Sequence, residues 1–147
     1  MLIEDKHDLR RFTTAQEEGV YERALAELKA GQKHSHWMWF IFPQVKGLGR
    51  TSTSELYAIK SEEEAQEYLR HPTLGVRLLE CTQALLAIEG KSALQILGSP
   101  DNLKFRSSMT LFASISEPGS VFARAIDKYY SGKPDWKTVD FLKPAKG

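Results

Sequence analysis

The chain has 147 residues, of which 41% are hydrophobic and 27% are charged, an ordinary composition for one folded domain without disordered tracts. Twenty Lys and Arg against nineteen Asp and Glu give a net charge of +1, so the basic excess typical of proteins that bind nucleic acid or anionic lipid is absent. We therefore expect one domain over residues 1–147 and no sequence-specific nucleic-acid partner.

The sequence also predicts a cytoplasmic protein that does not enter a membrane. Its longest apolar run, residues 37–42, is too short to cross a bilayer. The first six residues lack the apolar core of a signal peptide. Cys81 is the one cysteine, so no internal disulfide can form, which suits a reducing compartment.

Apolar spacing predicts helices from the start of the chain. Apolar side chains recur every three or four positions over residues 9–28, which indicates one amphipathic helix, or two if Gly19 interrupts it. Residues 37–42 form either a short helix capped by Ser35 or a buried strand, because periodicity does not decide for so short a run. Residues 44–54 contain two glycines among polar residues and are the longest predicted loop.

Caps and helix breakers mark the elements of the second half. A turn of helix begins at Ser54, and serine, threonine or aspartate caps with glycine or proline stops then predict six further helices. These cover residues 61–70, 73–88, 92–97, 100–115, 121–130 and 135–142. The expected fold is all-α, or mainly α, in one compact domain of about seven or eight helices, with minor strand content left open.

An aromatic-rich segment is the first candidate site. Two tryptophans and two phenylalanines lie within residues 37–42, and their rings can hold a base or nicotinamide by stacking while His36 and Gln44 orient it by hydrogen bonds. The plainer interpretation is core packing, the commoner role of large aromatics. His34 and His36 lack nearby Cys or acidic partners, so we expect no metal site.

The second candidate site lies in the predicted helix that starts near Asp101. Ser107, Ser108 and Thr110 lie inside this helix, which hydroxyl side chains weakly disfavour. Lys104, Ser107 and Ser108 have helical neighbour spacing, so a cation and two hydroxyls can converge on a phosphate or carboxylate. Equally, the hydroxyls can bond to carbonyls one turn earlier. No recognised cofactor motif is present, and we expect no cofactor.

These two segments carry a family resemblance. Residues 35–44 (SHWMWFIFPQ), Gly47-Leu48-Gly49 and residues 106–112 (RSSMTLF) resemble the domain-of-unknown-function 1810 family, and the likeness spans nearly the whole chain. It implies a small helical protein without an established activity, and some members carry the label calpastatin. A fainter similarity to the helical NADAR superfamily implies NAD or ADP-ribose chemistry. That superfamily has a Ser-Glu-His motif, whereas here Ser35 directly precedes His36.

Two hypotheses of function remain open. In the first, a pocket binds a nucleotide or ADP-ribose-like ligand and acts on its glycosidic bond. Its residues would be Trp37 or Trp39 for stacking, Lys104, Arg106, Ser107, Ser108, Thr110 and Gln44 for polar contacts, and His36 or Asp101 for proton transfer. In the second, the same pocket senses a metabolite, or the aromatic segment docks a protein partner, without chemistry. A concave aromatic lining would favour a small ligand, and a flat exposed patch would favour a partner.

Overall fold

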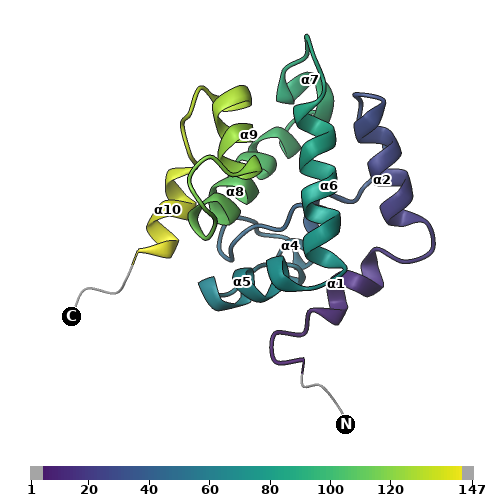
Figure 1. Ribbon diagram of the computed structural model, residues 1–147. Coiled ribbons are helices and arrows are strands. Elements are labelled where there is room, and N and C mark those ends of the chain that lie inside the picture. The colour runs from purple at the N-terminus through teal and green to yellow at the C-terminus, as the bar shows by residue number, and fades with distance from the viewer. Residues whose placement is uncertain (1–4, 144–147) are drawn as a thin grey trace.

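The computed structural model describes residues 5–143, and helices dominate this range (Figure 1). Ten helices lie within it: α1 (Arg10–Ala15), α2 (Val20–Lys29), α3 (Met38–Ile41), α4 (Ser52–Leu56), α5 (Glu62–Arg70), α6 (Leu74–Leu86), α7 (Ala93–Leu97), α8 (Asp101–Ser114), α9 (Val121–Tyr130) and α10 (Trp136–Leu142). The mainly helical single domain is confirmed, but the expected number of seven or eight helices is too low. Residues 1–4 and 144–147 of the predicted domain lie outside the described residues.

The additional helices come from the first third of the chain. Glu18 and Gly19 both have positive φ, at 59° and 81°, and a right-handed helix cannot pass through two such residues, so α1 and α2 are separate. The aromatic segment is helical, which decides between the two alternatives left by periodicity. Ser35 does not cap it: Trp37 is the N-cap residue, and the Ser35 hydroxyl donates instead to Glu27 at 2.5 Å.

The core forms where α6 and α8 meet the remaining helices. α6 packs against α2, α5 and α9, and α8 packs against α7, α9 and α10; in Figure 1, α6 runs down the middle with α2 on one side and α8 and α9 on the other. Aromatic rings fill the interior, with edge-on pairs Phe12–Tyr68 and Phe42–Phe105 at 5.0 and 4.9 Å between centroids. Such pairs add to the stabilisation from burial alone.

One extended contact fixes the loop that follows α3. The Ile59 N–H donates to the Gln44 carbonyl at 2.8 Å, and the Lys46 N–H donates to the Ile59 carbonyl at 2.9 Å. These two bonds form an isolated parallel bridge between Val45 and Ile59. Among residues 5–143, this bridge is the whole of the minor strand content, and it anchors the start of the 44–54 loop.

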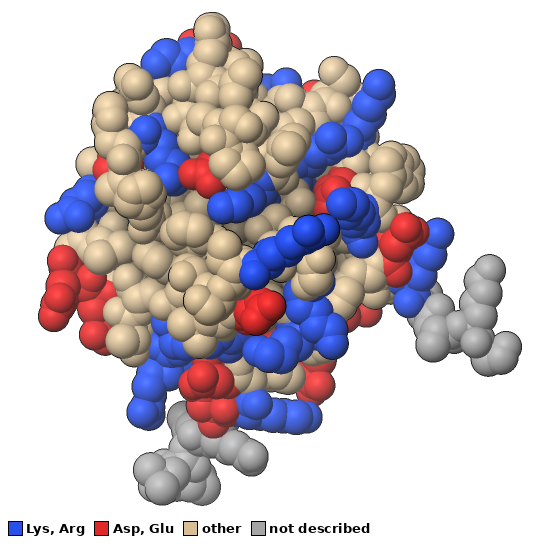
Figure 2. All heavy atoms as spheres, turned by 180° about the vertical axis from the view of Figure 1, so that it is seen from behind, with Lys and Arg blue, Asp and Glu red and all other residues tan. Residues whose placement is uncertain are grey.

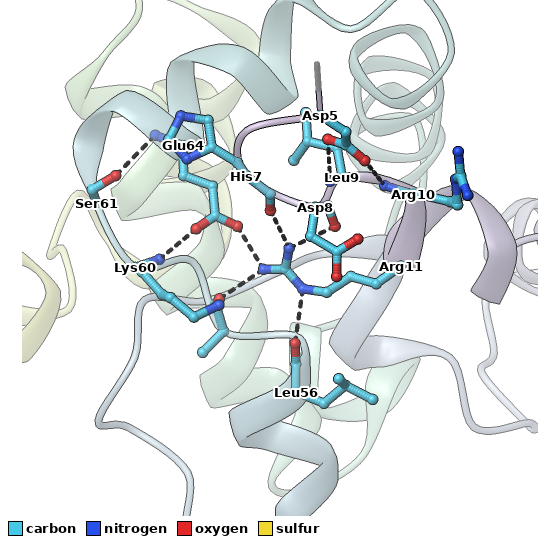
Figure 3. A network of polar contacts seen from close by, with 11 residues as sticks. Asp5, His7, Asp8, Leu9, Arg10, Arg11, Leu56, Lys60, Ser61 and Glu64 are labelled. Atoms are coloured by element: carbon cyan, nitrogen blue, oxygen red, sulfur yellow. Dashed lines mark hydrogen bonds and ion pairs between the residues drawn. The ribbon is translucent and has the colours of Figure 1, made fainter. Parts of the chain in front are cut away.

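A buried arginine holds the segment between α4 and α5 (Figure 3). Arg11 donates to the carbonyls of Leu56 and Ala58 and, at 2.5 Å, to the carboxylate of Glu64. Glu64 in turn accepts the Lys60 N–H at 2.9 Å. The side chains of Arg11 and Glu64 are 7% and 2% exposed, so this is an interior ion pair in which most donors have partners.

No helix within residues 5–143 is both long and apolar enough to span a membrane.

Candidate ligand-binding cleft

Three distant segments enclose a cleft of about 540 Å³. One wall comes from the 39–54 stretch, another from the first turns of α8, and the third from the residues that begin α10. Within residues 5–143, the lining consists of Trp39, Gln44, Leu48, Gly49, Arg50, Thr51, Ser54, Pro100, Leu103, Lys104, Arg106, Ser107, Asp135 and Lys137. Its volume falls within the range usual for small-molecule sites.

The cleft brings together five of the predicted ligand-binding residues. They are Trp39, Gln44, Lys104, Arg106 and Ser107. The aromatic segment and the α8 segment were separate candidates in the sequence, and the fold places parts of both on one cavity. Their proximity supports a shared role for the two segments.

Trp39 and Lys104 meet across the cleft wall. The Lys104 ammonium lies 4.6 Å from the centroid of the Trp39 ring, a cation–π contact. The same ammonium lies 3.4 Å from the Asp101 carboxylate. Both side chains are half-buried, so the ring has accessible surface and a positive charge stands beside it.

Arg106 shapes the cleft by fixing the chain that leads into α10. Its Nε donates to the Lys133 carbonyl and its Nη2 to the Pro134 carbonyl, each at 3.0 Å. The guanidinium also lies 5.7 Å from the ring centroid of Tyr130. Nη1 has no partner among residues 5–143 and remains able to bind a ligand. The main role of Arg106 is therefore to hold the chain that leads into α10.

Asp135 joins α8 to α10 at the cleft. Its Oδ2 accepts the Ser107 hydroxyl at 2.9 Å and the Thr138 N–H at 3.2 Å, and the latter bond caps α10 as predicted. The Thr110 hydroxyl accepts the Asp135 N–H at 2.9 Å and donates to the Arg106 carbonyl. These hydroxyls thus serve the junction between the two helices.

Thr110 and Ser108 lie behind the cleft surface. Both residues are buried, at 4% and 0% exposed, and neither lines the cleft. The Ser108 hydroxyl has no partner among the described residues. Because α8 is buried on most sides, Ser107 is the one predicted hydroxyl residue of this helix that lines the cleft with Lys104.

Positive charge dominates the cleft lining. Arg50, Lys104, Arg106 and Lys137 contribute cations, and Asp135 is the one carboxylate among the lining residues that the structure describes. On the face shown in Figure 2, Lys and Arg side chains gather across the middle, with Asp and Glu interspersed. A concave surface with excess positive charge attracts anions. Sequence reasoning missed Arg50 and Lys137, because neither stands in a recognisable motif.

Trp37 has a different environment from Trp39. It is 1% exposed, and its indole N–H donates to Glu27 at 2.9 Å. Glu27 also accepts the N–H groups of His34 and Ser35 and the Ser35 hydroxyl. Burial alone would raise the pKa of Glu27, but these hydrogen bonds outweigh it and lower the pKa to about 2. Trp37 is therefore part of the core and holds its segment in place.

The two residues considered for proton transfer lie outside the cleft lining. His36 is exposed. Asp101 lies between two lysines, with its carboxylate 2.9 Å from the Lys33 ammonium and 3.4 Å from that of Lys104. No group of three potential metal ligands occurs in the part of the chain that the structure describes.

A larger hollow of about 700 Å³ lies near the start of the chain, between residues 5–13 and 63–72. Its acidic residues, Asp5, Glu63 and Glu67, are balanced by three basic ones, Lys6, Arg10 and Arg70. Such a lining has no net attraction for either sign of charge. Neither of the sequence segments that predicted a site reaches it, and the 540 Å³ cleft is the better candidate.

Comparisons with known proteins agree with the predicted family. The family described as "Protein of unknown function (DUF1810)" matches residues 6–142. Among solved structures, the chain is similar to the conserved hypothetical protein Rv1873 from Mycobacterium tuberculosis, with 47% identity over 96% of this chain and all of that one, and a TM-score of 0.93. No curated protein matches. These findings support neither the calpastatin label nor the NADAR resemblance.

Proposed function

The chain belongs to the DUF1810 family, which is described only as being of unknown function, and from its own geometry we propose that its cleft binds a small anionic ligand of the nucleotide or ADP-ribose type. The observation that carries this proposal is the combination of one half-buried tryptophan, Trp39, with four cationic residues on one concave surface. A phosphate matches the cations, and a planar group matches the ring.

Concavity favours a small ligand over a docked protein. Trp37 is 1% exposed, so the aromatic segment does not present a flat patch of two tryptophans. Trp39, the tryptophan with accessible surface in this segment, faces a hollow. Among the alternatives without chemistry, these features favour metabolite sensing, because a partner-binding site would need a contiguous exposed apolar face.

A second candidate function, hydrolysis of the ligand's glycosidic bond, rests on Asp135. Glycosidic cleavage typically needs carboxyl groups beside the scissile bond. Asp135 is the one carboxylate among the cleft-lining residues, and its Oδ1 has no hydrogen-bond partner within residues 5–143. His36 and Asp101 do not line the cleft, so we propose Asp135 in their place for this function.

Binding is tested by titration calorimetry and thermal shift with AMP, ADP-ribose, NAD and ribose 5-phosphate. A ligand present at about a hundred times its Kd should stabilise the fold by about 2.7 kcal/mol. Arg50→Ala and Lys137→Ala should each weaken binding, because both side chains are exposed at the cleft and have no structural partner among the described residues. Arg124→Ala, an exposed arginine on α9, is the matched control and should bind normally.

The same samples separate binding from hydrolysis. If the protein releases free base or nicotinamide and Asp135→Asn abolishes this release, the protein is an enzyme that hydrolyses the glycosidic bond. Asparagine keeps the α10 cap, because it caps helices as well as aspartate does. Binding without release of base or nicotinamide would instead indicate a metabolite sensor without enzymatic activity. If none of the four ligands binds, or if the Arg50 and Arg124 variants behave alike, the proposed site is wrong.

A further inference from the structure

A second hollow of about 290 Å³ adjoins the cleft. The two share Trp39, Gln44, Gly49 and Ser54 in their linings. A Cβ at Gly49 would clash with the Ser54 side chain, so glycine allows these two shared residues to pack closely against each other. Because the two cavities share these lining residues, a ligand that extends past Trp39 can occupy both cavities.

The walls of the second hollow are aromatic and apolar. Trp39 and Tyr57 contribute rings, and Val45 and Ala58 contribute buried apolar surface. Phe12 and Phe40 hold the Tyr57 ring, with centroid distances of 5.8 and 5.3 Å. A ring fixed in this way can stack on a ligand with little loss of side-chain freedom.

Two polar groups in this hollow are available to a ligand. The Gln44 side-chain amide and the Tyr57 hydroxyl have no hydrogen-bond partners among residues 5–143, whereas the nearby backbone groups of Gln44 and Lys46 are engaged in the bridge to Ile59. An amide and a hydroxyl offer both donors and acceptors. They suit the edge of a neutral heterocycle, which also presents both kinds of group.

We propose that this second hollow, the ring pocket, binds the heterocyclic base of a nucleotide whose phosphate lies in the basic cleft. The inference rests on the proposed function, because the phosphate is assigned to the cleft. It narrows the ligand class to molecules with a planar ring at one end and an anionic group at the other. The charged residues of the ring pocket, Lys46, Glu55 and Lys60, are exposed and leave its apolar walls to the base.

The experiment compares the affinities of AMP, GMP, CMP and UMP with that of ribose 5-phosphate, which lacks the base. At least one nucleotide should bind about ten-fold more tightly than ribose 5-phosphate, a gain within the range that stacking of one base provides. Tyr57→Leu should remove most of this gain. Tyr57→Phe keeps the ring and its packing, and should weaken that nucleotide by about two- to ten-fold through loss of the hydroxyl.

Ribose 5-phosphate is the internal control for every variant. Its affinity should change less than about two-fold in both Tyr57 variants, because Tyr57 does not line the cleft. The ring pocket is overturned if no nucleotide binds more tightly than ribose 5-phosphate, or if Tyr57→Phe and Tyr57→Leu both retain the full gain. Failure of the proposed function looks different: ribose 5-phosphate and all four nucleotides then fail to bind the unmodified protein.

Discussion

Removal of Arg11 should destabilise the protein strongly, because this residue holds the wall of the ring pocket. Its guanidinium donates to the carbonyls of Leu56 and Ala58, which flank Tyr57, and to Glu64 at 2.5 Å. It also donates to the carbonyls of His7 and Asp8 (Figure 3). Loss of one partner of a buried ion pair leaves a charge without compensation, which costs about 3–5 kcal/mol.

Arg11→Met keeps an apolar stem and deletes the charge. We expect the free energy of unfolding, measured by urea denaturation at pH 7, to fall by about 3–5 kcal/mol, and Tm to fall by about 10 °C. The control is Arg70→Met, which breaks an ion pair to Glu67 of 3.2 Å whose side chains are 69% and 46% exposed. An exposed pair of this kind contributes about 0–1 kcal/mol, so the control should remain near the unmodified protein.

A double mutant separates the ion pair from general damage to the core. Arg11→Met with Glu64→Met removes both charges, so the cost should be less than the sum of the two single changes by about 2 kcal/mol or more. Additive losses would show that the two charges are not coupled. A loss for Arg11→Met as small as that for Arg70→Met would refute the reasoning from burial.

Three further outcomes follow from Gly75, Glu27 and Cys81. Gly75→Ala should lower the free energy of unfolding by about 1–3 kcal/mol or more, because the added Cβ would meet the Leu69 carbonyl at 2.0 Å. Glu27→Gln should destabilise the protein at pH 7 in urea denaturation, and the difference should shrink as pH falls from 4.5 toward the folded pKa of about 2. Burial, aided by the charge of Glu80, raises the pKa of Cys81 to about 12, so Ellman's reagent should not label it at pH 8 until urea unfolds the chain.

The sequence predicted helices well wherever the signals were local. Ser61, Ser92 and Asp135 each cap a helix with the side chain, as expected from residue type alone. Thr73 is the N-cap residue of α6 but makes no capping bond. The His71 ring instead accepts the N–H groups of Thr73 and Leu74. This contact is also local, because it joins residues two and three positions apart. It was missed because histidine is not among the residue types that usually cap helices.

Prediction of the site was likewise limited to signals that are local in the sequence. Spacing within one helix correctly grouped Lys104 with Ser107. It could not bring Arg50 or Lys137 to them, because these residues come from other segments and only the folded chain joins them. Composition treated Trp37 and Trp39 as equivalent, yet one is buried and the other lines two cavities. Residues two apart on a helix point in nearly opposite directions, so about half a helical turn separates the buried ring from the ring that lines the cavities.

The cleft residues divide into those that build the site and those that are free to bind. Arg106 and Asp135 are engaged in the junction between α8 and α10, so alanine at either position changes stability and affinity together. Arg50 and Lys137 are exposed and without structural partners within residues 5–143, so their substitution reports affinity alone. A site whose frame is fixed before the ligand arrives loses little conformational freedom on binding. A change in affinity on substitution of Arg50 or Lys137 can therefore be attributed to a lost contact with the ligand.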